Sequence, residues 1–403
     1  MKMFRALRSR NFALLLAGSF AANVGIWMQS VALGWLIYSL TSSASWLGRI
    51  GFAQSLPTLV FGFVGAALIE HLDRKRVMAA SALLYAGSAF ALAFLTITHL
   101  VEIWMVIALS FVTGVATALY MPVFQASIPS LVPPEDLMNA ISLNSLSFNV
   151  ARVIGPLVAG AVMTAAGEGW CFAANGMGFL VLVATILAMR MPSRQTGRTG
   201  PLGRSLVAGL DYARRHPVIR AMLLLCFTLS LFGFPFVVLM PALAKDVLGQ
   251  GADGFTHLFS SVGAGAVVGG LGLALAGDVR RKGDLIVGCA LAFGLLLVVV
   301  ANSASFVGAA VAFGFVGAAM IICIASLNTL VQMTVDENMR TRVMSMVTVS
   351  LFGLPTLGAW MLGAIGDRIG IPAALSLGGG MVATAAVAVF LFAPEVREVG
   401  AKA

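Results

Sequence analysis

Charged side chains are scarce in this sequence. Asp, Glu, Lys and Arg together make up 10% of the 403 residues, whereas a soluble domain carries about 25%. Hydrophobic residues make up 60%, which is more apolar surface than a water-soluble core absorbs. Lipid is therefore the solvent for most of the chain. In lipid, only helices and closed barrels satisfy all their backbone hydrogen bonds.

Motifs that would carry chemistry are also missing. The four cysteines lie in apolar runs without paired spacing, so we expect small buried hydrophobes rather than disulfides or metal ligands. The sequence has no Gly-x-x-x-x-Gly-Lys-Ser/Thr phosphate loop and no His-Glu-x-x-His pair. Its four histidines suggest no Ser-His-Asp arrangement. We expect no enzyme, no cofactor and no metal, and an ion gradient is the remaining energy source.

Apolar runs long enough to cross a bilayer, about 20 residues each, recur along the whole chain. A polar stretch at 191–217 interrupts them and is predicted to be a linker ending in a short amphipathic helix on the membrane surface. It separates an N-terminal six-helix bundle, 1–190, from a C-terminal one, 218–403. The twelve predicted transmembrane helices lie near 12–39, 45–69, 77–98, 103–129, 139–165, 170–190, 218–244, 255–276, 285–301, 305–333, 343–366 and 371–393.

Basic residues are distributed asymmetrically about these spans. If the N-terminus is cytoplasmic, the cytoplasmic segments contain 21 of the 25 Lys and Arg residues. The positive-inside rule therefore predicts a multi-pass protein of a bacterial-type inner membrane with both termini in the cytoplasm. The net charge of +9 is then a topology signal, and we expect no nucleic-acid partner. The four exceptions are Arg49, Arg152, Lys245 and Arg368.

The two halves repeat three features in the same order. Each half has a basic turn after its second helix, an acidic turn between its fourth and fifth helices, and a proline in its fifth helix. Both halves start on the same side, so we expect a parallel repeat about an axis along the membrane normal, with a site between the halves. The paired features are 72–76 and 277–282, 133–136 and 335–338, and Pro156 and Pro355.

Several segments resemble one known family. The runs 25–43, 54–57, 144–160 (with 151–156) and 209–217 are similar to the drug:proton antiporter-3 branch of the major facilitator superfamily, which includes macrolide-efflux-like and enterobactin-exporter-like proteins. The resemblance implies an all-α major facilitator fold and export of a small organic molecule, drug-like or siderophore-like. It also implies alternating access, with protons as the coupling ion. We expect a monomer.

Polar residues inside the spans are candidates for the substrate cavity, because buried charge in lipid is costly. Arg152 lies 13 residues after Asn139, the predicted start of its helix, or about 20 Å along it, near the middle of the bilayer. A structural role for Arg152 stays open, as do hydrogen bonds between helices for the amides. The candidates are Asn23, Gln29, Gln54, Asn149 and Arg152.

The basic turns provide gating candidates. The superfamily pattern Gly-x-Leu-Ala-Asp-Arg is replaced here by residues 66–71, Ala-Ala-Leu-Ile-Glu-His. The resemblance implies that Glu70 takes the role of the gating carboxylate that caps a helix of the other half. A solvated charge cluster that only sets topology is the alternative. The gating candidates are Glu70, Asp73, Arg74, Asp278 and Arg280, and the hinge candidates, which static kinks would equally explain, are Gly155, Pro156 and Pro355.

Other functions stay open from the sequence. No Asp or Glu lies in the middle of a predicted span, so proton coupling rests on the resemblance, although carriers coupled to protons usually hold a titratable group in the cavity. The alternatives are a lysophospholipid flippase-like carrier, a nutrient importer and a non-transporting scaffold or sensor. A membrane enzyme would need a polar catalytic cluster at one membrane face, and the sequence suggests none.

Overall fold

The computed structural model describes residues 5–69, 73–189, 211–277, 279 and 281–398. These residues form helices and short turns and contain no strand. The chain divides into two compact units. The first comprises 1–41 and 50–199, and the second comprises 42–49 and 200–403. The main division between residues 199 and 200 falls inside the predicted linker, and the extent of that linker stays a prediction.

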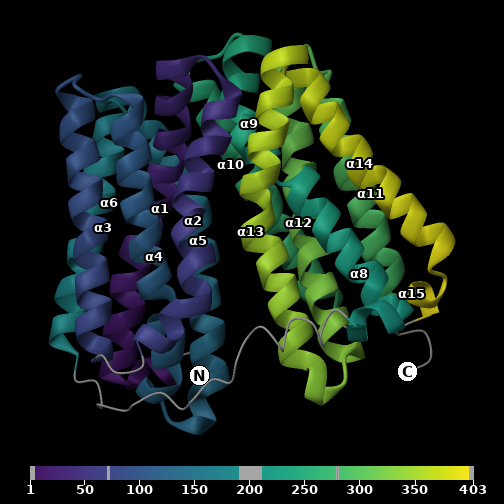
Figure 1. Ribbon diagram of the computed structural model, residues 1–403, viewed down its shortest axis with the longest axis horizontal. Helices are drawn as coiled ribbons and strands as arrows, with labels where there is room; N and C mark the ends of the chain where they lie inside the picture. Colours follow the sequence, from purple (N-terminus) through teal and green to yellow (C-terminus); the bar gives the residue numbers. More distant parts are fainter. Residues whose placement is uncertain (1–4, 70–72, 190–210, 278, 280, 399–403) are drawn as a thin grey trace. The chain divides into compact units, whose positions relative to one another are not determined.

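Long helices form the first unit (Figure 1), where α3 and α6 run side by side. Helix α1 packs against α5 and α6, and α3 packs against α4 and α6. Two short 3-10 turns, Arg5–Arg8 and Pro134–Asp136, precede α1 and α5. The helices are α1 (Arg10–Thr41), most of α2 (Ala44–Ile69), α3 (Arg74–Ile97), α4 (Ile103–Leu131), α5 (Leu137–Ala166) and α6 (Glu168–Ala188).

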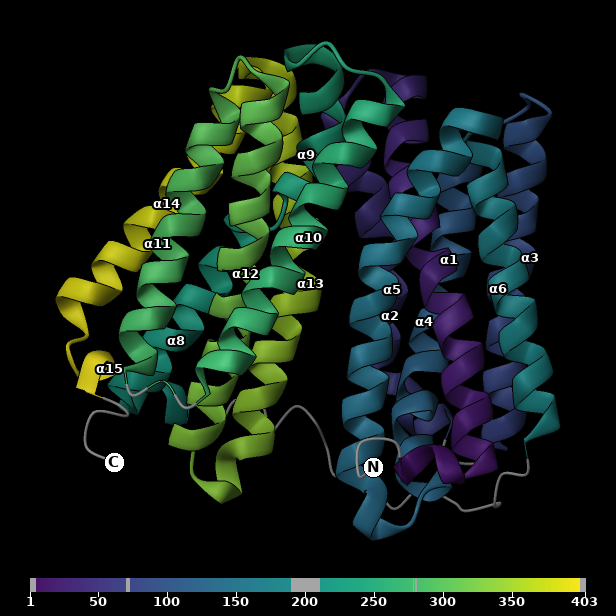
Figure 2. The ribbon, with the colours of Figure 1, turned by 180° about the vertical axis from the view of Figure 1, so that it is seen from behind.

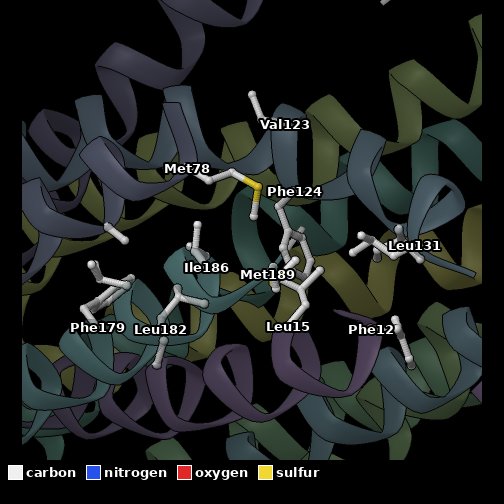
Figure 3. Packing of buried hydrophobic residues seen from close by; sticks show 14 of the residues in the cluster. Phe12, Leu15, Met78, Val123, Phe124, Leu131, Phe179, Leu182, Ile186 and Met189 are labelled. Carbon is white, nitrogen blue, oxygen red and sulfur yellow. The ribbon is translucent and has the colours of Figure 1, made fainter. Parts of the chain in front are cut away.

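Buried apolar side chains hold α1, α3, α4 and α6 together (Figure 3). Leu15 of α1, Met78 of α3 and Ile186 of α6 are each 0–1% exposed. The rings of Tyr85 and Phe179 stack with their centroids 4.2 Å apart. This cluster makes one side of the first unit a closed, well-packed core.

In the second unit, α10 lies along α12, and α11 lies between α12 and α14 (Figure 2). The linker helix is described only at residues 211–215, where the Tyr212 hydroxyl donates to the carboxylate of Asp336, the residue that precedes α13 (2.9 Å). The other helices are α8 (Pro217–Thr228), α9 (Phe236–Ala242), α10 (Ala252–Ala276), α11 (Lys282–Ala301), α12 (Phe306–Thr334), α13 (Glu337–Ile369), α14 (Ile371–Phe392) and α15 (Glu395–Glu398).

The predicted span 218–244 differs from a regular helix. The segment Pro217–Val247 contains α8, a π turn at Leu229–Gly233, α9 and a second π turn at Leu243–Val247. Pro235 follows the first π turn and has no amide hydrogen to continue the α-helical pattern. Gly358 of α13 packs against this break, and a Cβ there would collide with the Leu231 carbonyl. Pro156 and Pro355, in contrast, lie inside continuous helices.

Eleven helical segments of the described chain are long and apolar enough to cross a membrane. Helix α2, 26 residues long, is not among these eleven, and its span stays a prediction from the sequence. Large apolar side chains cover the outside of the helices, for example Leu275 at 88% exposed and Phe392 at 83%. Such surfaces are stable in lipid, so the structure agrees with the membrane solvent inferred from composition.

Candidate functional site

A pocket opens inside the first unit, among α1, α3, α4, α5 and α6. Its volume is about 150 Å³. Phe124, Phe179 and Leu182 belong both to its wall and to the apolar core of Figure 3, so one side of the pocket is formed by the packed core. The lining residues are Ser19, Ala22, Asn23, Ile26, Tyr85, Thr117, Tyr120, Met121, Phe124, Gln125, Asn144, Phe148, Phe179 and Leu182.

Neutral hydrogen-bonding groups line this pocket, and none of its lining residues is charged. Tyr85 and Thr117 are hydrogen-bonded through their hydroxyl oxygens. Thr117 donates its own proton to the Thr113 carbonyl (2.8 Å), so the Tyr85 hydroxyl is the donor in that pair. The Tyr120 hydroxyl oxygen is buried and has no hydrogen-bond partner. A buried hydroxyl without a partner is costly, so Tyr120 is the wall residue best placed to gain from a polar ligand.

Two aromatic rings connect Arg152 to the pocket by direct contacts. Its guanidinium carbon is 5.4 Å from the centroid of the Trp27 ring. Trp27 in turn meets Phe148, a lining residue, edge-to-face at 5.9 Å. Arg152 has no ion pair among the described residues, and the cation–π contact gives it a partner inside the helix bundle.

Helix α5 presents these groups on one face. Phe148, Arg152 and Gly155 follow at spacings of four and three residues, which places them above one another on a helix. A Cβ on Gly155 would collide with Cβ of Trp27. The missing side chain therefore allows α5 to approach α1 closely, which brings Arg152 over the indole ring.

A sequence profile described as "Transmembrane secretion effector" (MFS_3) matches residues 1–403, the whole chain. The chain belongs to this family of the major facilitator superfamily. The predicted family membership is confirmed. The protein is therefore a multi-pass membrane transporter of small molecules, and not an enzyme.

Two relatives and one solved structure describe the similarity. The chain is 24% identical to macrolide efflux protein A of Streptococcus pyogenes over 72% of each chain. It is 25% identical to the enterobactin exporter EntS of Shigella boydii, over 96% of this chain and 92% of that one. A bacterial homologue of the human lysosomal transporter Spinster, solved inward-facing and unoccupied, has a TM-score of 0.70 at 15% identity over 98% and 97% of the two chains. The major facilitator fold is thereby confirmed.

The predicted cavity residues of the transporter lie in different surroundings, and only some of them are at the pocket. Asn23 lines the pocket, and Arg152 reaches it through Trp27. Gln29 is 9% exposed and accepts a hydrogen bond from Asn175 of α6 (2.6 Å). This contact between helices is the alternative that the sequence left open for it. Roles in transport for all of these residues stay predictions.

Gln54 and Asn149 also lie away from the pocket wall of the transporter. Gln54 is half-buried on α2, and its backbone carbonyl oxygen would collide with a Cβ on Gly114 of α4. Asn149 is exposed, and its amide donates to the Ser145 carbonyl one turn earlier on α5 (2.8 Å). Neither side chain is grouped with Asn23 in the structure.

The gating candidates are only partly visible. Glu70, Asp278 and Arg280 lie outside the described residues. Asp73 precedes α3 and accepts a hydrogen bond from the Arg76 amide (2.9 Å), which is an ordinary helix cap. The Arg74 guanidinium reaches the Ala126 carbonyl of α4 at 3.4 Å.

Sequence reasoning missed most of the polar wall. The transporter has four tyrosines, and two of them, Tyr85 and Tyr120, line the pocket. Gln125 and Asn144 are amides inside predicted spans, so the criterion that selected Asn23 would have selected them as well. Tyrosine combines an aromatic ring with a hydroxyl group, so a search for tyrosines inside the predicted spans would have selected Tyr85 and Tyr120.

Proposed function

We propose that this transporter exports a small organic molecule, drug-like or siderophore-like, and that the neutral aromatic pocket binds one part of it. The observation that carries the proposal is the pocket with its unpartnered Tyr120 hydroxyl. The relatives support the direction of transport, because they are named as efflux proteins and exporters. Alternating access of this pocket is the mechanism that the family fold supports.

The size of the pocket limits what it holds. A cavity of about 150 Å³ accommodates a group of roughly benzene size, whereas pockets for whole drug-sized ligands are about 300–1,000 Å³. We therefore assign to the pocket one ring, or a group of similar size, from a larger substrate. Stacking on Phe148 and a hydrogen bond from the Tyr120 hydroxyl are the contacts that such a ring would make.

Arg152 supplies a positive charge that contacts Trp27, whose ring meets the lining residue Phe148. We propose that it holds an anionic or strongly polar substituent of the same substrate, with Trp27 fixing the direction of the guanidinium. Removing the charge with Arg152→Gln is expected to lower transport strongly without preventing membrane insertion. Normal export by that variant would remove Arg152 from the site.

We propose further that both termini face the cytoplasm of a bacterial inner membrane and that the protein works as a monomer. The positions of 21 of the 25 basic residues support this orientation.

Protons are proposed as the coupling ion. Support for proton antiport comes from the family resemblance and from the lack of a phosphate-loop motif in the sequence. Glu70 and Asp278 stay proposed gating groups near the inner face.

The test is transport in proteoliposomes of known orientation with a panel of macrolides, siderophores and lysophospholipids, with and without an imposed pH gradient. Export of an organic solute that depends on the gradient and is accompanied by proton counterflow is expected. Net uptake without a gradient, transbilayer movement of lysophospholipid alone, or no movement of any compound by folded protein would each refute the proposal.

A further inference from the structure

The two acidic turns of the sequence repeat occupy equivalent places in their helical units. Asp136 directly precedes α5, and Asp336 directly precedes α13. An aspartate at this position usually accepts a hydrogen bond from an amide in the first turn of its helix. Neither carboxylate accepts such a bond from the described amides of its helix. Each one instead contacts the segment that precedes the first helix of its own half of the sequence.

In the first unit, residues 5–9 hold the turn before α5. The Arg5 guanidinium forms an ion pair with the Asp136 carboxylate, with 3.0 Å between Nε and Oδ1. The Ala6 amide donates a hydrogen bond to the side-chain oxygen of Asn139, in the first turn of α5 (2.9 Å). Ala6 is 1% exposed and the Asp136 side chain 12%. These contacts, the α5 latch, therefore form a packed surface and not a solvated cluster of charges.

In the second unit, residues 211–216 hold the turn before α13 in the same way. The Tyr212 hydroxyl donates to the Asp336 carboxylate (2.9 Å) and accepts a hydrogen bond from the Asp336 amide (3.1 Å). The Tyr212 ring lies against the His216 ring, with 4.1 Å between the centroids. We call these contacts the α13 latch.

The two latches explain the acidic turns that repeat in the sequence. Both join partners far apart in the chain, 133 positions for Ala6 and Asn139 and 124 for Tyr212 and Asp336. Both hold the start of the fifth helix of a half, and both leave an aspartate unavailable for ordinary capping. The chemistry of the partners differs, since one latch uses an arginine and the other a tyrosine. The shared feature is thus the place that is held.

The α5 latch acts on the helix that faces the pocket. Helix α5 runs unbroken from Leu137 to Ala166, so its start and its middle move together. Phe148, a lining residue, lies eleven residues after Leu137, or about 17 Å along the helix. Arg152 follows one turn later. A small tilt at the latched end would therefore displace both side chains relative to α1 and α4.

We propose that Arg5, Asp136 and Asn139 are positioning residues for substrate binding, because the α5 latch holds the helix that presents Phe148 and Arg152. The proposal rests on the export function and the pocket proposed above. The α13 latch holds its own helix in the same manner but does not act on the pocket, since none of the residues that line the described pocket belongs to α13. Substrate affinity is thus sensitive to one latch and not to the other.

Hydrogen exchange of the full-length protein in lipid nanodiscs, measured by mass spectrometry, tests the contacts without any substrate. Arg5→Met is expected to raise amide exchange in residues 5–9 about two- to fivefold, the factor that a half-exposed ion pair typically contributes. Arg5→Lys should restore the parent rate, because the contact uses one nitrogen and keeps its charge. Arg8→Met is the matched control, since it removes an equal charge from an exposed neighbour in the same 3-10 turn.

Export kinetics in proteoliposomes test the positioning role. The double variant Arg5→Met with Asn139→Ala loses the ion pair and the Ala6 hydrogen bond together. If half of the molecules or fewer remain latched, KM rises about twofold or more, and the maximal rate stays at the parent value. Tyr212→Phe should raise exchange in residues 211–216 by a similar factor as Arg5→Met and leave KM unchanged. Asp211→Asn, at an exposed neighbour, should change neither quantity.

Two results would overturn the proposal. Exchange at the parent rate in Arg5→Met, or an equal rise in Arg8→Met, would show that the ion pair does not hold the segment. Raised exchange with an unchanged KM in the double variant would show that the latch serves only the fold. Absence of export by the folded parent protein would refute the proposed function instead, and the exchange rates would still decide whether the latch exists.

Discussion

Replacing Tyr120 by Phe separates the role of the pocket in binding from its role in folding. The change removes one oxygen atom and keeps the ring, which stacks on Phe124 with 5.4 Å between the centroids. In the free protein that oxygen is buried and has no hydrogen-bond partner. Transport should therefore lose a contact that the folded protein alone does not use.

Tyr120→Phe is expected to act in opposite directions on the stability of the substrate-free protein and on the affinity for substrate. A buried polar atom without a partner costs about 1–3 kcal/mol, so Tyr120→Phe should leave the substrate-free protein as stable as before or more stable by up to that amount. A hydrogen bond to substrate is worth about 0.5–1.5 kcal/mol. Its loss corresponds to an affinity about two- to thirteen-fold weaker.

Tyr85→Phe is the matched control. Tyr85 lines the same pocket, but its hydroxyl already donates to Thr117. Removing it should lower stability by about 0.5–1.5 kcal/mol and change substrate affinity less than Tyr120→Phe does. Thermal unfolding of the purified protein and the KM for export in proteoliposomes give the two readouts. Lower stability of substrate-free Tyr120→Phe together with an unchanged KM would refute the reasoning, because the hydroxyl would then serve the fold.

Two further predictions concern packing and helix ends. Gly155→Ala should destabilise the protein by about 1–3 kcal/mol through overpacking against α1. Gly87 has open space around it, so Gly87→Ala is the control and should be neutral or stabilising by up to about 1 kcal/mol. Equal shifts of the unfolding temperature in the two variants would contradict the close α1–α5 contact. Lys75→Met removes the ammonium group that caps the end of α6 at the Leu187 and Met189 carbonyls (2.8 and 2.7 Å) and should lower stability by about 0.3–1 kcal/mol. Arg76→Met, an equal charge loss at an exposed neighbour, should cost less, and the reverse order in thermal unfolding would refute the capping role.

The helices were largely predictable, because lipid leaves the backbone few alternatives. The predicted span 103–129 corresponds to α4 at Ile103–Leu131, and 371–393 corresponds to α14 at Ile371–Phe392. The break at Pro235 was only partly predictable. Proline identifies a place where helical bonding fails, but neighbouring helices decide whether the chain kinks, as here, or continues through it, as at Pro156.

The site was less predictable, since depth in the membrane does not give direction. Arg152 was identified by its depth, but its partner Trp27 lies on another helix and depended on the α1–α5 packing that Gly155 permits. Gln29 met the same depth criterion as Asn23, yet it points to Asn175 of α6. Helical periodicity tells which residues share a face, but only the tertiary packing shows whether that face meets the pocket or another helix.

The chemistry of the pocket bears on how selective the transporter is. An apolar wall discriminates weakly between ligands, by about 1–3 kcal/mol for each methylene group, whereas a site built to pair with a polar substrate group rejects analogues that lack it far more strongly. In the described pocket, Phe148 and Met121 are wall groups of the first kind and the Tyr120 hydroxyl is a group of the second kind. Compounds that carry a hydrogen-bond acceptor on the ring should therefore lose affinity in Tyr120→Phe, and compounds without one should be exported as before. If both classes lose affinity equally, the ring and not the hydroxyl recognises the substrate, and the pocket is selective by shape alone.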